Sequence, residues 1–275
     1  MDLLENWIVP PEALTGPLAY ALAMFAALFF VSVDKGGLGG GVGIVSVPLL
    51  MQVAPVKFVI GMWLPVLVVC DFCTIRSYPS QWRFGAVKRL VPGVLLAVAG
   101  TSIALNMMNL EGDAPQAKQL QAWLKLSVAV ISIVYLMGKM RPAPDEALPP
   151  WQPTWTMSWI VGVLGGITTT IAHAAGPIVT MYLLPQKLER REYVGTAGRF
   201  YFALNSLKIP SFIAIGLVNV HSLRYGLWLM VLSPFGVWLG SWLNRKISAV
   251  WFVRVLHFSL VLAAGKLAWD AFRDF

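Results

Sequence analysis

The stretch "DKGGLGGGVGIVSVPLL" (Asp34–Leu50) interrupts a long apolar region with glycine and with charge. It follows the apolar residues 17–33, and six of the eight residues from Gly36 to Gly43 are glycine. Glycine in a helix costs about 1 kcal/mol per residue relative to alanine. The stretch therefore predicts that a helix breaks here, with Asp34 and Lys35 beside the break.

The composition of the chain is that of a membrane protein. Its 275 residues are 57% hydrophobic and 12% charged, which is about half the charged fraction usual in soluble domains. The net charge of +8 comes from basic residues that stand singly or in short clusters between apolar segments. This pattern is typical of membrane topology and not of a nucleic-acid-binding face.

The acidic N-terminal stretch lacks the basic residues of a cleaved signal peptide, so we expect it to be retained. Cys70 and Cys73 have no redox or zinc-binding context, so we expect neither a metal nor a cofactor.

Two similar halves organise the chain. A proline-rich linker, residues 141–154, separates them, so we expect membrane repeats at 1–140 and 155–275. "IVSVPLL" (Ile44–Leu50) aligns with "IVTMYLL" (Ile178–Leu184) at an offset of 178 − 44 = 134 residues. The same offset pairs Gly61 with Gly195, Asp71 with Asn205 and Thr74 with Lys208. The ten expected apolar segments are 17–33, 42–54, 58–75, 84–106, 122–138, 156–171, 174–185, 193–218, 224–243 and 250–269.

The segments 42–54 and 174–185 are too short to span a membrane, which takes about 20 helical residues. Each break is either a dent in one long span or the tip of a re-entrant hairpin. Only the hairpin interpretation, with the N-terminus outside, places the basic loops 76–89, 186–192 and 244–249 together in the cytoplasm. One hairpin and three spans per half is an odd number of spans, so the halves are inverted. The predicted fold is an all-α polytopic membrane protein of two inverted repeats, each a broken or re-entrant helical hairpin plus three transmembrane helices.

Backbone N–H groups at a hairpin tip within the membrane lack helical partners and are tolerated only where protein or a polar cavity receives them. Glycine permits left-handed dihedrals and close approach, and N–H groups at a helix start attract anions. We therefore predict an anion cradle at this tip, meeting the turn Thr169–His173 of the second half near the midplane. The alternative is that the glycines serve close helix packing.

The motif "GLGGGVGIVSVPLL" (Gly37–Leu50) resembles the glycine-rich motif of the sulfite exporter TauE/SafE family, within the wider toluene sulfonate uptake permease group. The duplicated halves and the chain length fit the same family. The resemblance implies an integral membrane transporter for small sulfur-containing anions such as sulfite and organosulfonates. The second copy, "TTTIAHAAGPIVTMYLL" (Thr168–Leu184), departs from the glycine-rich form.

Ionisable residues within membrane spans are functional candidates because burying one costs at least about 2.5 kcal/mol. Repeat symmetry suggests that Asp71 and Lys208 pair with each other, which would leave other cations for the anion. Whether they form a structural pair or belong to the site stays open at this point. The expected proton-coupling residues are Asp34 and Asp71. The expected substrate-binding residues are Lys35, Gly39, Gly40, Gly41, Gly43, Thr169, Thr170, His173, Arg199, Asn205 and Lys208.

The expected function is a secondary transporter of the bacterial inner membrane that exports sulfite or an organosulfonate bound between the two tips. A membrane potential of about 100 mV favours exit of an anion by about 2.3 kcal/mol per charge. The alternative is proton-coupled uptake of an organosulfonate or other small organic anion. An intramembrane enzyme is disfavoured, because the three histidines lie in separate segments and acidic residues are few. The expected partners are the anion and membrane lipid but no nucleic acid, and a homo-oligomer is left open.

Overall fold

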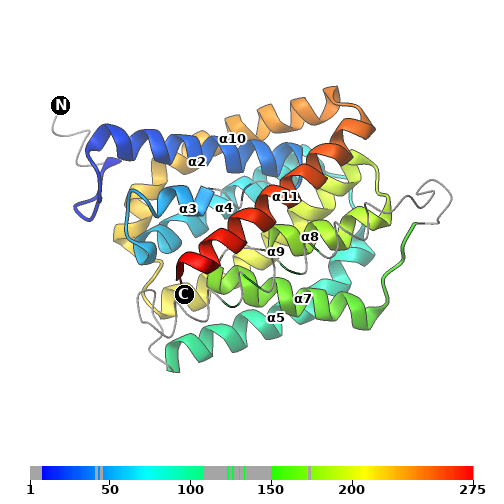
Figure 1. Cartoon of the computed structure of the whole chain (residues 1–275), viewed down its shortest axis with the longest axis horizontal. Helices are drawn as coiled ribbons and strands as arrows, with labels where there is room; N and C mark the ends of the chain where they lie inside the picture. The colour runs from blue at the N-terminus through cyan, green and yellow to red at the C-terminus, as the bar shows by residue number, and fades with distance from the viewer. Residues whose placement is uncertain are drawn as a thin grey trace.

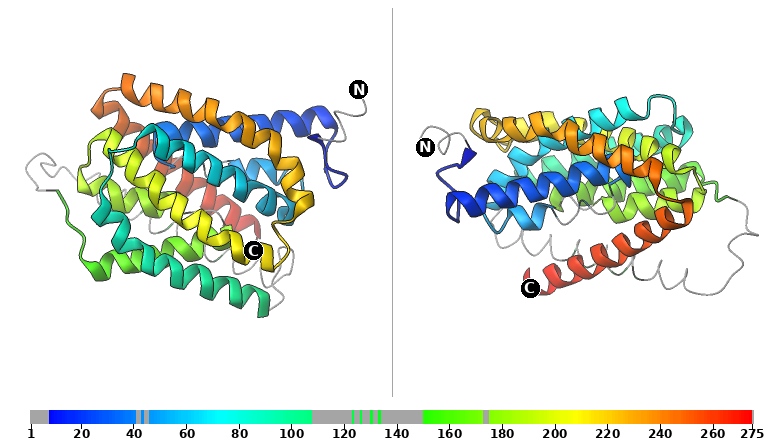
Figure 2. Two further views of the ribbon diagram at one scale, coloured as in Figure 1. Left: turned by 180° about the vertical axis from the view of Figure 1, so that it is seen from behind. Right: turned by 90° about the horizontal axis from the view of Figure 1, so that it is seen from above.

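The computed structural model shows a bundle of long helices (Figures 1 and 2). It describes residues 8–40, 43, 46–107, 150–172 and 175–274, with the single positions 123, 126, 130 and 133. Within these residues every regular element is helical, as the sequence predicts. The elements are α2 (Pro17–Gly37), α3 (Ser46–Leu50), α4 (Val56–Ser77), α5 (Phe84–Met107), α7 (Trp155–Ala172), α8 (Gly176–Leu183), the 3-10 turn η2 (Leu184–Gln186), α9 (Arg190–Ala214), α10 (Val220–Lys246) and α11 (Ala249–Asp274).

Four helices of the described chain are long and apolar enough to cross a membrane, and they lie within α2, α4, α5 and α10. Their outer faces carry large apolar side chains: Leu18 is 75% exposed, Val231 78% and Phe235 66%. Exposed apolar surface on this scale is expected where lipid rather than water surrounds the protein. The prediction of a multi-pass membrane protein is therefore confirmed.

The helices form two groups that meet along α4 and α9. In the first group α10 packs against α2 and α4, and in the second α5 packs against α7 and α9. Gly36 and Gly37 allow α2 to approach α10, since a Cβ on either would lie 2.2 or 2.8 Å from the carbonyl oxygen of Val237 or Gly240. The first glycines of the motif therefore serve helix packing, which was the alternative interpretation.

Both broken segments return to the end of the bundle where they began. The backbone N–H of Leu14, just before α2, donates to the carbonyl of Val53, which follows α3, at 2.9 Å. In the second half the N–H of Trp151, before α7, donates to the carbonyl of Pro185, after α8, at 3.0 Å. The chain thus makes a hairpin in each half rather than one dented span.

The basic loops gather at one end of the bundle. Arg83, after α4, forms an ion pair of 3.1 Å with Glu192 at the start of α9. Nearby, Arg190 donates to the carbonyl of Asn244 near the end of α10, at 3.1 Å. We call this the basic end: residues 78–83, 187–192 and 244–248. The opposite end holds the residues before α2 and the start of α10, where Glu12 and His221 lie 3.1 Å apart.

Candidate functional site

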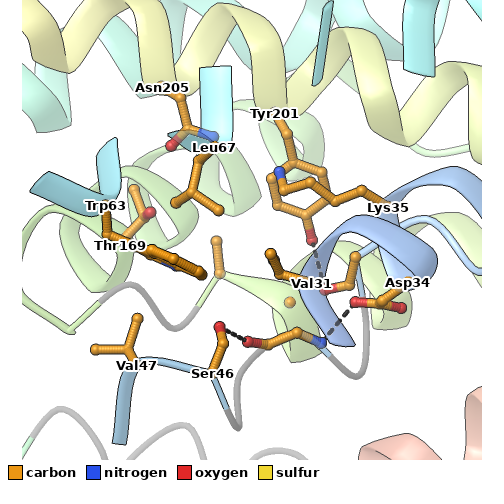
Figure 3. Close-up of a pocket in the computed structure, with 14 residues that line it drawn as sticks. Val31, Asp34, Lys35, Ser46, Val47, Trp63, Leu67, Thr169, Tyr201 and Asn205 are labelled. Carbon is orange, nitrogen blue, oxygen red and sulfur yellow. Dashed lines mark hydrogen bonds between the residues drawn. The ribbon is translucent and has the colours of Figure 1, made fainter. Parts of the chain in front are cut away.

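A buried pocket lies inside the bundle where both hairpins meet the middle of α4 and α9 (Figure 3). The space open to the centres of water molecules is about 50 Å³. One water needs roughly 10–15 Å³ by this measure, so about three to five water-sized groups fit. The polar side chains of the lining are Asp34, Lys35, Ser46, Thr169, Tyr201 and Asn205.

Asp34 accepts backbone hydrogen bonds from the loop that follows α2, at the tip of the first hairpin. Its backbone carbonyl accepts the N–H groups of Leu38 and Gly39, at 2.7 and 2.9 Å. Its carboxylate Oδ2 accepts the N–H of Gly43 at 2.5 Å, and Ser46 Oγ then donates to the carbonyl of Gly43 at 2.5 Å. The N–H groups of Gly39 and Gly43 were expected to face an anion. The structure shows instead that Asp34 already accepts both of them.

Tyr201, on α9, holds the tip against the rest of the site. A Cβ on Gly40 would lie 2.5 Å from the tyrosine ring, and the backbone φ of Gly40 is +90°, which other residues rarely adopt. The ring also lies beneath Lys35, whose Nζ is 4.5 Å from the ring centroid. Sequence analysis missed Tyr201. The available signal was its place four residues before Asn205, on the same face of the helix.

Lys35, Asp71 and Asn205 form the polar centre of the site. Lys35 Nζ makes an ion pair with Asp71 Oδ1, and Asn205 Nδ2 donates to Asp71 Oδ2 at 2.7 Å. Asp71 is fully buried, and Lys35 and Asn205 are nearly so. A buried ion pair persists only if its remaining oxygens are hydrogen-bonded, and Asn205 provides that bond. Lys35 and Asn205 line the pocket, whereas Asp71 lies behind them.

Lys208 takes a different partner from the one that repeat symmetry suggested. Its Nζ donates to Thr169 Oγ1 at 3.1 Å, and Thr169 in turn lines the pocket. The expected ion pair between Asp71 and Lys208 is not formed, because the ionic partner of Asp71 is Lys35. The residue directly opposite Asp71 is its repeat equivalent, Asn205, and Lys208 lies almost one turn further along α9.

Four of the predicted substrate-binding residues do not line the pocket: Gly39, Thr170, Arg199 and Lys208. The hydroxyl of Thr170 donates to the carbonyl of Gly166 in its own helix, at 2.7 Å. Arg199 lies toward the basic end, where its guanidinium donates to the carbonyls of Tyr78 and Pro79 at 2.9 and 2.6 Å. It therefore caps the end of α4. Gly41 and His173 lie outside the described residues.

Trp63 is a second residue that sequence analysis missed. It is fully buried on α4 and lines the pocket, and Figure 3 shows its side chain reaching from the helix toward the pocket. Its indole Nε1 has no hydrogen-bond partner within the part of the chain that the structure describes. A buried tryptophan N–H usually has a partner, so an open donor beside a cavity indicates a water molecule or a ligand.

A small cavity lined in part by buried polar and charged side chains, inside an apolar helical bundle, defines an integral membrane protein with an internal pocket. Among the described residues no group of three or more His, Cys, Asp or Glu side chains could hold a metal ion. The chain belongs to the sulfite exporter TauE/SafE family, whose model matches residues 24–267 and so includes the tips of both hairpins and every residue that lines the pocket. No curated protein and no solved structure matched the chain.

Proposed function

We propose that this protein is a secondary transporter that binds sulfite, or a closely related sulfur oxyanion, in the pocket and exports it. The observation that carries the proposal is the pocket itself, in which lysine, asparagine and indole donors surround a cavity within a membrane protein. Burying such groups in a membrane is costly, so they are retained mainly where they serve function. Membership of the sulfite exporter family supports a sulfur anion as the substrate.

The size of the cavity favours a small inorganic anion. Sulfite has one sulfur and three oxygens, and roughly three to five water-sized groups fit in about 50 Å³. An organosulfonate adds a carbon chain for which this cavity has little room. The anion would meet the ammonium of Lys35, the amide of Asn205 and the indole N–H of Trp63. Gly39, Gly40 and Gly43 would act by shaping the tip beside it.

The packing supports a pseudo-two-fold relation between residues 1–140 and 155–275. The contacts of α10 with α2 and α4 correspond to those of α5 with α7 and α9. Asn205 and Asp71, which are equivalent by the offset of 134, contact each other, and equivalent residues can touch only near the two-fold axis. Gly61 packs against the segment after α9, and its equivalent Gly195 packs against the segment after α4. Inverted repeats around a central site are the usual basis of alternating access.

The distribution of charge supports an orientation with the basic end in the cytoplasm and both termini outside, in a bacterial inner membrane. In that orientation the membrane potential drives the anion outward without a further energy source, by about 2.3 kcal/mol per charge at 100 mV. Export is therefore the proposed direction.

Cysteine labelling tests the proposed topology. In a background without Cys70 and Cys73, single cysteines at Ser80 and Lys187 should both react only with reagent applied from the cytoplasm, because both residues lie at the basic end. A cysteine at Gly16, an exposed residue before α2 with open space around it, should react only from outside. Labelling of Ser80 and Lys187 from opposite sides would rule out the inverted arrangement.

Flux in proteoliposomes tests the transport function. Vesicles containing the protein should release sulfite faster than protein-free vesicles, and an imposed potential, negative inside, should accelerate release. Methanesulfonate and a longer alkylsulfonate, tested in parallel, should move progressively more slowly as the carbon chain grows. Sulfite release equal to that of protein-free vesicles would refute the proposed function.

Trp63→Phe tests whether the open indole donor binds the anion. Phenylalanine keeps an aromatic ring but removes the N–H, and a hydrogen bond to a charged group contributes about 1.5–3 kcal/mol. Sulfite binding should therefore weaken by roughly 10- to 150-fold, measured by calorimetric titration. Trp228→Phe is the matched control. The indole of Trp228 likewise has no partner within the described chain, but it lies outside the pocket lining, so its replacement should change the affinity less than twofold. Equal effects of the two substitutions would contradict the assignment of Trp63.

A further inference from the structure

The hydrogen-bond donors of Asp71 are the same side chains that a bound anion would need. Lys35 and Asn205 satisfy the two carboxylate oxygens of Asp71, and both also line the pocket. Asp71 is fully buried behind them. An anion in the cavity would therefore compete with Asp71 for both donors.

The charges around the pocket balance before any anion enters. Four buried residues of the described chain that carry a formal charge lie in or beside it: Lys35 and Lys208 are basic, and Asp34 and Asp71 are acidic. Their formal charges sum to zero, so the cluster offers an anion no net attraction. Adding an anion would leave uncompensated negative charge in a low-dielectric interior, which is strongly unfavourable. One proton taken up by the cluster would offset one such charge.

The two carboxylates differ in how firmly their donors are fixed. Asp34 accepts a backbone N–H of the tip, which can move only if the loop rearranges. Asp71 accepts from two side chains, each of which can turn toward the cavity by rotation about its own bonds. Asp71 is therefore the carboxylate that loses its partners when an anion binds.

We propose that Asp71 is an internal counter-anion, which releases Lys35 and Asn205 to the bound substrate and takes up one proton as the substrate binds. This inference rests on the proposed function. The proton comes from the solution on the side where the anion enters. It leaves Asp71 when the anion departs and the ion pair with Lys35 forms again, so anion and proton cross the membrane together. Doubly charged sulfite then carries one net negative charge outward, and the membrane potential still favours its exit.

The other ionisable groups near Asp71 leave this assignment unchanged. Lys208 and Tyr201 face it from α9, Lys35 from α2, and Cys70 lies beside it on α4. On α10, the uncharged hydroxyl of Ser233 interacts with the thiol of Cys70. Of these neighbours only Lys35 forms an ion pair with Asp71 in the described chain.

Calorimetric titration of the purified protein with sulfite, in buffers of different ionisation enthalpy, counts the protons taken up on binding. Sulfite itself binds a proton near neutral pH, so the informative quantity is the difference between wild type and Asp71→Asn. The expected difference is one proton per anion. Linkage of one proton also makes wild-type affinity fall about tenfold more per pH unit than that of the variant, over the pH range in which Asp71 is ionised in the free protein and protonated in the complex. Glu12→Gln, which neutralises an exposed carboxylate far from the pocket, is the matched control and should keep the wild-type proton count.

Infrared difference spectra of the wild type give a second measurement, which does not depend on the folding of a variant. Addition of sulfite should produce the carbonyl band of a protonated carboxyl group. An unchanged proton count in Asp71→Asn, or no carboxyl band in the wild type, would overturn the inference while leaving the anion site in place. No binding of sulfite by the wild type would overturn the proposed function and, with it, this inference.

Discussion

Lys35→Met should abolish sulfite binding and lower the free energy of unfolding by about 3–5 kcal/mol, the usual cost of removing one partner of a buried ion pair. The carboxylate of Asp71 would stay fully buried, and within the described chain Asn205, at 2.7 Å, would be its only remaining side-chain hydrogen-bond partner. The aromatic face of Tyr201 would lose its cation as well. Thermal unfolding in detergent measures the stability, and the shift of the midpoint with added sulfite measures binding.

A double substitution separates the two roles of Lys35. Lys35→Met combined with Asp71→Asn removes both charges, so much of the lost stability should return while sulfite binding stays absent. Lys88→Met, at an exposed position on α5, is the matched control and should change neither quantity. If the double variant binds sulfite as the wild type does, Lys35 is not a ligand of the anion.

The sequence was sufficient to predict the hairpins, because their cause is local. Glycine and charge within an apolar segment, together with the placement of basic loops, indicate a break that returns to its own side. The structure agrees, since Leu14 meets Val53 and Trp151 meets Pro185. The packing role of Gly36 and Gly37 has no such local cause. It becomes evident only in the fold, where the backbone of α10 leaves no room for a side chain at either position.

The ion pair could not be predicted from repeat alignment alone. Symmetry correctly brought the positions of Asp71 and Asn205 together, and they do touch. It could not identify the counter-ion, because Lys35 comes from α2, whose register against α4 depends on packing that no alignment of the halves contains. The same limit applies to Arg199, whose long side chain reaches the carbonyls at the end of α4 instead of the pocket.

The aromatic residues of the site were missed for a related reason. Trp63 and Tyr201 lie on apolar helices, where an aromatic side chain usually belongs to the hydrophobic core. Only the folded arrangement distinguishes them, because it places the indole N–H of Trp63 beside a cavity and the ring of Tyr201 against Gly40. Their contribution to binding therefore rests on tertiary contacts.

Gly40→Val should also abolish sulfite binding, through the shape of the tip rather than through charge. A Cβ at this position would lie 2.5 Å from the ring of Tyr201, so the ring or the tip must move. The backbone φ of +90° adds strain that costs on the order of 1–3 kcal/mol. Because Lys35 Nζ lies over the same ring, displacement of Tyr201 would also disturb the main cation of the site. The loss of binding is measured as a smaller rise in unfolding temperature when sulfite is added.

The matched control for Gly40→Val is Gly85→Val, at a helical position where a Cβ meets nothing within 4 Å, and it should leave the sulfite-induced shift intact. Tyr201→Ala in the Gly40→Val background then separates the two causes, because it makes room for the new side chain but leaves the strained φ in place. Stability should recover in part, by the share that the collision contributed, whereas binding should stay weak because the lysine has lost its aromatic support. If sulfite raises the unfolding temperature of Gly40→Val as much as that of the wild type, anion binding does not depend on the geometry of this tip. Gly40 would then serve helix packing alone, as Gly36 and Gly37 do.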